Sequence, residues 1–185
     1  MDGLENLKRL MHLKEVFRTG KVKGREESTA EHVYGCMILA EHFLKTVKEP
    51  LDELKVMKLI LYHDLVEMET GDVFVLDEKN RENKKEKEME GAQRLSKKIP
   101  STIADEFVEM FTEYEEGKTK EAKFTKAIDV LEPMVHWANY ETDWTKYGFT
   151  EDNLKTKKIK YLEEFPELLD FFNRLMEQLK KEKYF

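Results

Sequence analysis

The stretch of sequence that decides the fold reads LILYHDLVEMETGD over residues 59–72. Its first half is apolar without interruption, which in a chain with 38% charged residues predicts a helix buried on nearly all sides. His63, Asp64 and Glu67 interrupt this apolar helix. Burying an isolated ionisable group costs several kcal/mol, so three such groups together predict a shared partner such as a metal ion.

A continuous helix would place these three side chains on one face, because Glu67 follows His63 and Asp64 by about one turn. Imidazole and carboxylate ligands suit Mn, Co, Fe, Ni and Zn, and the order of metal affinities does not select among them. The segment therefore predicts one divalent cation of unspecified identity.

Other helices must complete the coordination sphere, and His32 and Asp129 are the candidates. His32 follows Ser28 and Glu31, which form a capping box at the start of an apolar helix. Asp129 is a carboxylate among the apolar residues of AIDVL, residues 127–131. The order is then His, His-Asp, Asp, and the predicted metal ligands are His32, His63, Asp64 and Asp129.

This order resembles the HD-domain metal-dependent phosphohydrolases, and more closely their 5'-deoxynucleotidase branch. In that branch His-Asp-x-x-Glu is followed by Thr-Gly-Asp and preceded by an arginine. The matching residues here are HDLVE at 63–67, TGD at 70–72 and Arg18, and the segment 113–129 is similar too. The resemblance implies a helical HD-type fold, a homodimer, and removal of the 5'-phosphate from (deoxy)ribonucleoside monophosphates to give nucleoside and phosphate.

The resemblance also implies roles for residues around the metal. Arg18 would orient the substrate phosphate through its forked donors, although its position alone fits a cation at a helix C-terminus. Asp72 would contact the nucleotide, or help Glu67 to hold a second cation such as Mg, although an ordinary turn aspartate also fits. Glu67 lies one turn from the ligands, so it would accept the proton of the attacking water or position that water.

Three further side chains are predicted to reach the substrate. Asp64 and Asp129 would contact it as metal ligands. Lys126 lies one turn before Asp129, so it forms either a simple ion pair or a phosphate contact. Members of the branch that reject ribonucleotides carry a tryptophan after the arginine, whereas this chain has Thr19, so exclusion of ribonucleotides is not implied.

Other functions fit the motifs less well. Hydrolases of guanosine tetraphosphate favour an acidic pair where this chain has Glu67 and Met68, and the Gly-Tyr-Pro signature of HD-type cyclic-dinucleotide phosphodiesterases is missing. A nucleotide or metal sensor without turnover would keep the ligands but need no general base. A helical adaptor would use the polar cluster only as a buried hydrogen-bond network.

Composition narrows the class further. The net charge of -7 argues against a nucleic-acid partner, while a small phosphate ester remains compatible because charges are screened beyond about 8 Å. The sequence has no apolar run that could span a bilayer, and its acidic N-terminus does not resemble a secretory signal, so we expect a cytoplasmic protein without a membrane partner. The single cysteine, Cys36, lies in an apolar stretch and is predicted to be a small buried side chain.

Apolar spacing predicts an all-α bundle forming a single domain over residues 1–185. A first helix is expected from residue 4 to about 18, followed by a polar loop over 21–27. Further helices are expected over about 28–47, 52–68, 101–116 and 119–137, with two more after residue 150 that are separated at Phe165-Pro166. Residues 77–98 are predicted to be a solvated helix or a mobile loop entering one. The aromatic C-terminal helices would pack on the core or on a second subunit.

Overall fold

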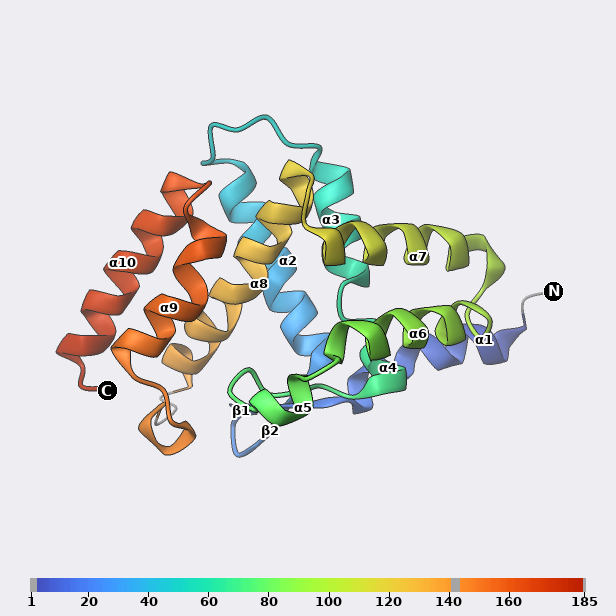
Figure 1. Ribbon diagram of the computed structural model, residues 1–185, viewed down its shortest axis with the longest axis horizontal. Helices are drawn as coiled ribbons and strands as arrows, with labels where there is room; N and C mark the ends of the chain where they lie inside the picture. Colours follow the sequence, from blue (N-terminus) through green and yellow to red (C-terminus); the bar gives the residue numbers. More distant parts are fainter. Residues whose placement is uncertain (1–2, 141–143, 185) are drawn as a thin grey trace.

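The computed structural model describes residues 3–140 and 144–184, and its architecture is helical (Figure 1). The α-helices are α1 (Leu4–Leu10), α2 (Thr29–Leu44), α3 (Glu53–Tyr62), α4 (Glu67–Thr70), α5 (Glu78–Arg81), α6 (Lys84–Ser96), α7 (Ser101–Glu116), α8 (Lys120–Asn139), α9 (Glu151–Leu162) and α10 (Pro166–Lys181). Two 3₁₀ helices, η1 (Met11–Glu15) and η2 (Trp144–Tyr147), and two strands, β1 (Phe17–Val22) and β2 (Arg25–Ser28), complete the described elements. The predicted all-α class is confirmed.

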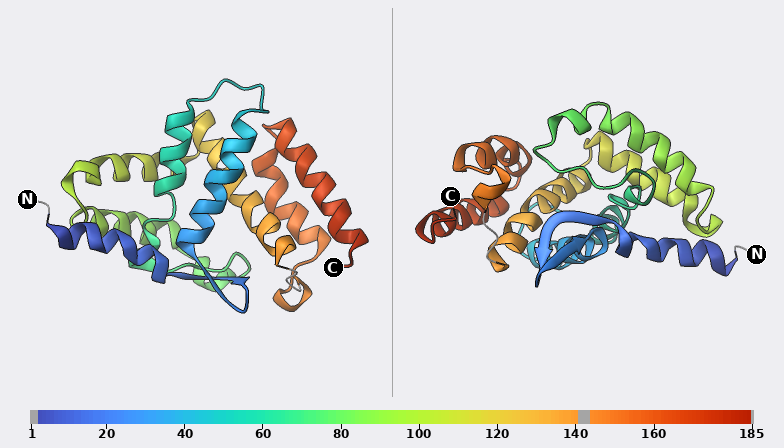
Figure 2. Two further views of the ribbon diagram at one scale, coloured as in Figure 1. Left: turned by 180° about the vertical axis from the view of Figure 1, so that it is seen from behind. Right: turned by 90° about the horizontal axis from the view of Figure 1, so that it is seen from below.

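Helices α2, α3 and α8 form the centre of the molecule, with α6 and α7 on one side and α9 and α10 on the other (Figures 1 and 2). Apolar side chains from these helices form a continuous buried cluster. Helix α10 contributes Leu168 and Phe172, which are fully buried within the chain. Packing on the core therefore accounts for the inner face of the last helix.

Capping residues set several helix boundaries as the sequence predicts. The Ser28 side chain accepts a hydrogen bond from the Glu31 N–H, and the Glu31 carboxylate accepts one from the Ser28 N–H, which completes the capping box of α2. Asp52 caps α3 and Thr119 caps α8 in the same way. Gly117 ends α7 with a φ of 61°, a conformation that glycine adopts without strain.

The N-terminal segment differs from the prediction of a helix to about residue 18 and a loop over 21–27. Helix α1 ends at Leu10, and after η1 the chain forms an antiparallel hairpin in which Arg18 pairs with Glu27. Lys23 and Gly24 both have positive φ, as a tight two-residue hairpin turn requires. Hydrogen bonds between the two strands thus replace those of the expected helix, and Arg18 projects from a strand.

The predicted continuous helix over 52–68 is also wrong. Helix α3 ends at Tyr62, residues 63–66 form turns, and α4 restarts at Glu67. The N–H groups of Leu65 and Glu67 bond to carbonyls three residues earlier, which tightens the backbone relative to an α-helix. His63 and Glu67 consequently lie on separate elements rather than on one helical face.

The charged segment 77–98 is helical rather than a long loop. Helix α6 packs on α4 and α7 and buries Ala92 and Leu95. The sequence also predicts a loop over residues 142–152, and residues 142 and 143 of this loop lie outside the described residues. Among the helices that are described, none combines the length and the apolar character needed to cross a bilayer.

Candidate metal centre

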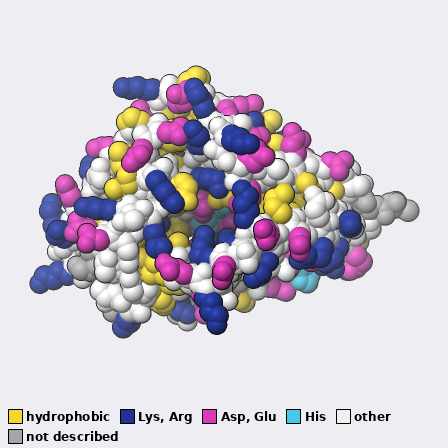
Figure 3. Space-filling model, viewed as in Figure 1, with side chains coloured by type: hydrophobic (Ala, Val, Ile, Leu, Met, Phe, Trp, Pro, Cys, Tyr) yellow, Lys and Arg dark blue, Asp and Glu magenta, His cyan; other side chains and the backbone are white. Residues whose placement is uncertain are grey.

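A pocket of about 400 Å³ opens between α3, α8, β1 and the segment after α4, with α6 and α9 at its edges. Its floor contains His63, Asp64, Glu67 and Asp129, and Arg18 also lines it. Figure 3 shows this hollow near the centre of the face, with Lys and Arg side chains around it. The pocket therefore combines acidic and imidazole groups inside with basic groups at its mouth.

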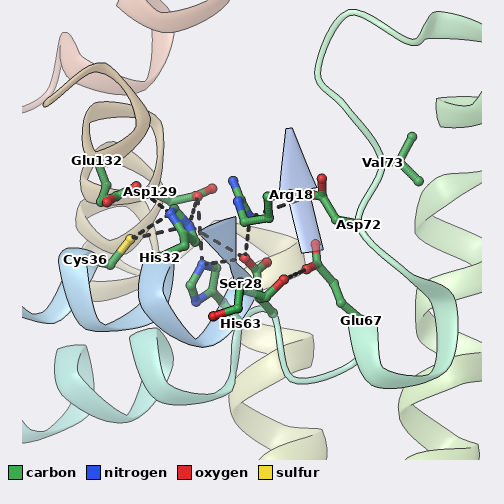
Figure 4. Close-up of polar contacts among 12 residues, drawn as sticks. Arg18, Ser28, His32, Cys36, His63, Glu67, Asp72, Val73, Asp129 and Glu132 are labelled. Carbon is green, nitrogen blue, oxygen red and sulfur yellow. Dashed lines mark hydrogen bonds and ion pairs between the residues drawn. The ribbon is translucent and has the colours of Figure 1, made fainter. Parts of the chain in front are cut away.

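The four predicted metal ligands converge from α2, the end of α3 and α8 (Figure 4). His32 Nε2 lies 3.1 Å from Asp129 Oδ1 and 3.6 Å from Asp64 Oδ2. His63 Nε2 lies 3.3 Å from Asp64 Oδ2 and 3.8 Å from Asp129 Oδ1. Because metal–ligand bonds of about 2.0–2.2 Å keep neighbouring donor atoms roughly 3.0–3.5 Å apart, these imidazole–carboxylate distances suit donors that share one cation.

The hydrogen bonds of the two imidazoles leave the right nitrogen for a cation. His63 Nδ1 donates to the carbonyl of Ile60 at 2.7 Å, and His32 Nδ1 lies 2.6 Å from Glu132 Oε2. Because Nδ1 keeps its proton in these contacts, Nε2 is the nitrogen of each ring that faces the carboxylates and that would bind a cation once its own proton is lost. His63 Nε2 is buried and has no hydrogen-bond partner among the described residues, as expected for an atom that binds an ion.

Electrostatics couple the imidazoles to the carboxylates. Burial alone would lower the pKa of His63, but the charges of Asp64 and Asp129 raise it. Burial alone would likewise raise the pKa of Asp129, yet its hydrogen bond to His32 and the nearby imidazole of His63 hold that pKa well below the usual range. The imidazoles are therefore protonated beside ionised carboxylates. A divalent cation would bind by displacing the protons on the imidazoles.

Arg18 and Asp72 lie beside this cluster, although they are distant in sequence. Arg18 Nη1 is 3.1 Å from Asp64 Oδ2 and 3.7 Å from Asp72 Oδ1. Burial would lower the pKa of the guanidinium, but Asp64, Glu67 and Asp72 outweigh this effect and raise it. The explanation of Arg18 as a helix C-terminal cation is wrong, since Arg18 lies on β1 and enters the pocket.

Glu67 is 2% exposed and lines the same pocket. The hydroxyl of Thr29 donates to Glu67 Oε2 at 2.8 Å and fixes the carboxyl group. Burial, and then the charge of Asp64, raise the pKa of Glu67 well above its usual value. A cation bound next to Asp64 would lower it again, so this carboxyl group can both hold and release a proton inside the pocket.

Lys126 lines the pocket but does not contact Asp129 as an ion pair would. Its ammonium lies 4.1 Å from the centre of the Tyr114 ring, and the Tyr114 hydroxyl donates to Asp129 Oδ2 at 2.7 Å. Cation–π contacts of this kind hold a lysine without neutralising it. The phosphate contact of Lys126 stays a prediction.

Sequence reasoning missed the residues that hold the predicted ones. Glu132 contacts His32, Tyr114 contacts Asp129, and Thr29 contacts Glu67. The sequence contains a signal for Glu132, because this residue is a second carboxylate one turn after Asp129 in the apolar part of α8. Nothing local distinguishes the tyrosine and the threonine, since their partners come from other elements.

Cys36 is fully buried, as predicted, but it also lies beside the metal-ligand cluster. Its Sγ is 3.5 Å from His32 Nε2 and 3.9 Å from His32 Nδ1, one helical turn along α2. Burial raises the pKa of the thiol to about 12, so it stays protonated at neutral pH. The small-buried-residue interpretation is compatible with this environment.

The mouth of the pocket is basic. Lys84 comes from α6, whereas Lys157, Lys158 and Lys160 come from α9. The ammonium of Lys158 donates to the carbonyl of Val130 at 2.6 Å, and burial lowers its pKa to about 8. Lys84 is paired with Glu88 at 3.0 Å, so the lysines of α9 supply the charge that an anion entering the pocket would meet, in a chain that is acidic as a whole.

A helical bundle whose central helices bring two histidines and two aspartates to one buried point belongs to the class of metal-binding helical domains. The family model described as "HD domain" matches residues 10–169, and the chain belongs to the HD domain family. The predicted family membership is therefore confirmed.

Relatives and solved structures agree with this assignment. The 5'-deoxynucleotidase HDDC2 of Bos taurus is 31% identical over 93% of this chain and 83% of its own length. The human 5'-deoxynucleotidase HDDC2 is 29% identical with the same coverage. The crystal structure of a predicted metal-dependent phosphohydrolase from Magnetospirillum magnetotacticum MS-1 has a TM-score of 0.83 and 27% identity, and the match covers 100% of this chain and 98% of that one.

Proposed function

We propose that this protein is a metal-dependent phosphohydrolase that removes the 5'-phosphate from (deoxy)ribonucleoside monophosphates. The observation that carries the proposal is the meeting of a cation-sized donor set, an arginine and a buried carboxyl group in one pocket. The 5'-deoxynucleotidase names of the relatives support the 5'-monophosphate as the substrate.

One divalent cation would be held by His32, His63, Asp64 and Asp129. When bound, such a cation lowers the pKa of water and screens the charge of phosphoryl oxygens. The donor set accepts Mn, Co, Fe, Ni or Zn. Glu67 and Asp72 offer carboxylates on the other side of Arg18 for a second cation such as Mg (Figure 4).

Arg18 would hold the phosphate of the substrate. Its guanidinium is charged at every accessible pH and already lies among Asp64 and Asp72. Two parallel N–H donors match two phosphate oxygens, so the phosphate is fixed in one orientation. Asp72 and Asp64, which both approach Arg18 Nη1, would restrain the guanidinium.

Glu67 would take the proton from the attacking water. The water oxygen forms a bond to phosphorus, the bond between phosphorus and O5' breaks, and the leaving O5' takes up a proton to give the nucleoside. The hydroxyl of Thr29 holds one oxygen of Glu67 and leaves the other for the water. General-base catalysis of this kind contributes roughly 10²–10⁴ in rate.

The nucleoside would lie toward the outer part of the pocket. Phe74 of the segment after α4, Trp137 of α8 and Tyr161 of α9 line the pocket and would offer aromatic surface to a base. Lys126 would contact the phosphate from above the Tyr114 ring. A volume of about 400 Å³ suits a ligand of nucleotide size.

Reconstitution with metal tests the proposal. Protein stripped by a chelator is loaded with Mn, Co, Fe, Ni or Zn and given 5'-dAMP, 5'-dCMP, AMP and, as a positional control, 3'-dAMP. Phosphate release from the 5'-monophosphates that depends on added metal, and is much slower with 3'-dAMP, is the expected result. A protein that binds metal but releases no phosphate would be a sensor, and one that binds no metal would be an adaptor.

The expected homodimer belongs to the same proposal. Among the described residues, the exposed large apolar side chains include Tyr34 and Ile38 of α2 and Leu54 and Leu61 of α3. A second subunit would cover such a face. Light scattering of the purified protein measures the mass and distinguishes a dimer from a monomer.

A further inference from the structure

We propose that Glu132 is a positioning residue that orients His32 as a metal ligand. We also propose that position 35 is a glycine because a side chain there would collide with Glu132. This inference rests on the proposed metal site. It extends the site by two residues that lie outside the HD motif and outside the pocket lining.

The contact between Glu132 and His32 joins α8 to α2 inside the core. Glu132 Oε2 lies 2.6 Å from His32 Nδ1, with the histidine 0% and the glutamate 5% exposed. Figure 4 shows Glu132 on the side of the imidazole away from Arg18. A carboxylate accepts but does not donate, so it fixes the proton on Nδ1 and leaves Nε2 as the ligand atom.

The two histidines need different partners because they occupy opposite ends of helices. His63 follows the last residue of α3, where carbonyls lack intrahelical partners, and it uses the carbonyl of Ile60. His32 is the fourth residue of α2, in a part of the helix where the unpaired backbone groups are N–H donors. The acceptor for His32 must come from another element, and Glu132 of α8 supplies it.

Gly35 makes room for this acceptor. A Cβ at position 35 would lie 2.3 Å from Glu132 Oε1 and 2.9 Å from Glu132 Cγ and Cδ. Gly35 is inside α2, where glycine is less favourable than alanine for helix formation. Close approach of Glu132 to the helix gives a physical reason for glycine at a position that helix propensity disfavours.

The first experiment compares two substitutions of similar size at position 132. Glu132→Gln keeps a side-chain oxygen that can accept from His32 Nδ1, whereas Glu132→Met does not. Affinity for Co²⁺ and Mn²⁺ is measured by competition with a chelator, and the visible spectrum of the Co²⁺-loaded protein reports the ligand geometry. We expect Glu132→Met to bind about 10- to 100-fold more weakly with an altered spectrum, and Glu132→Gln to remain near the wild type.

The second experiment tests Gly35. Gly35→Ala should weaken metal binding as Glu132→Met does, although alanine favours the helix. The double variant Gly35→Ala/Glu132→Ala should bind no more weakly than Glu132→Ala alone, because alanine at position 132 has no Cγ or Cδ for a Cβ at position 35 to collide with. Glu41→Gln, an exposed change on the same helix, is the matched control and should leave affinity and spectrum unchanged.

The outcomes separate this inference from the proposed function. Equal affinities and spectra for Glu132→Gln and Glu132→Met would overturn the positioning role. Additive losses in the double variant would overturn the link to Gly35. A wild-type protein that binds no metal would instead overturn the proposed function, and phosphate release is not needed for either result.

Discussion

The floor and the mouth of the pocket are built in different ways. On the floor, Asp129 and Glu67 are each held by a hydroxyl from a separate element, and the imidazoles are fixed through Nδ1. At the mouth, Lys126 rests on an aromatic ring and Lys157 and Lys160 stand on α9 beside the opening. The floor is therefore constrained in geometry, whereas the mouth contributes mainly charge.

This difference separates the groups that would carry out the reaction from the groups that would attract the substrate. Groups that must share a cation need fixed positions to within a fraction of an ångström, and buried hydrogen bonds provide them. Groups that attract an anion act over several ångströms and tolerate movement. Substitutions on the floor should therefore reduce turnover by orders of magnitude, and those at the mouth by small factors.

The largest effect is expected from Asp64→Ala on the floor. It removes a carboxylate that faces both imidazoles and Arg18. Metal content, measured by elemental analysis, should fall to background together with metal-dependent phosphate release. Asp105→Ala, an exposed aspartate on α7, should change neither. Full activity with bound metal in the Asp64 variant would show that Asp64 is not needed as a metal ligand.

Glu67→Gln should separate metal binding from turnover. The amide retains the size of the carboxyl group and can accept from Thr29, but it cannot take a proton from water. We expect kcat to fall roughly 10²- to 10⁴-fold while the metal content stays that of the wild type. Unchanged kcat would mean that another group accepts the proton.

Arg18 lies between floor and mouth, and its variants should give an intermediate effect. Arg18→Ala removes hydrogen bonds to a charged phosphate, worth about 1.5–3 kcal/mol, so kcat/KM should fall roughly 10- to 150-fold. Arg18→Lys keeps the charge but loses the forked geometry and should recover only part of the loss. Equal rates for the two variants would show that charge alone is used there.

Lys126→Ala tests the mouth. Contacts of exposed charges are worth about 0.2–1 kcal/mol, so KM should rise about 1.5- to 5-fold with little change in kcat. Added salt should shrink the difference from the wild type because it screens the lysine. Lys118→Ala, an exposed lysine paired with Glu116, is the control. A large loss of kcat would place Lys126 at the reacting phosphate instead.

Glu27, a buried carboxyl group that also lines the pocket, should give the smallest effect, on stability alone. Burial, and then the charge of Glu132, raise the pKa of Glu27 to about 7 from a usual 4.5. The folded state then binds this proton more tightly than the unfolded state does, so stability falls as pH rises from about 4.5 to about 7.

Glu27→Gln removes that titration. The melting temperature of the chelator-treated variant should match the wild type near pH 4.5 and exceed it at pH 8. Glu26→Gln, the exposed neighbour that pairs with Lys21, should run parallel to the wild type at all pH values. A wild type that gains stability between pH 5 and 7 relative to Glu27→Gln would contradict the raised pKa.

Local sequence signals predicted the features that depend on interactions between neighbouring residues, such as the helix starts. The capping residues Ser28, Asp52 and Thr119 mark helix starts that the structure reproduces. The order of histidines and aspartates pointed to side chains whose imidazole nitrogens the structure brings within 4 Å of the two aspartate carboxylates. Burying unpaired ionisable groups in apolar helices costs free energy. Their presence therefore indicates that these side chains meet at one site, even before the fold is known.

The remaining features depend on contacts that no local pattern encodes. The apolar spacing of residues 4–17 suits a helix, yet pairing between β1 and β2 determines the end of that segment. The continuous apolar run around Tyr62 hides the break at His63, which tertiary packing imposes. Glu132 and Thr29 matter only because α8 and α2 pass next to other elements.

The convergence of α2, α3 and α8 has a consequence for folding. His32 and Asp129 are separated by 97 positions along the chain, so an ion held by both would act as a reversible cross-link around a long loop. Such an ion stabilises the native state according to its free concentration relative to its dissociation constant. The resistance of this protein to heat and proteolysis should therefore report how well its surroundings supply the metal.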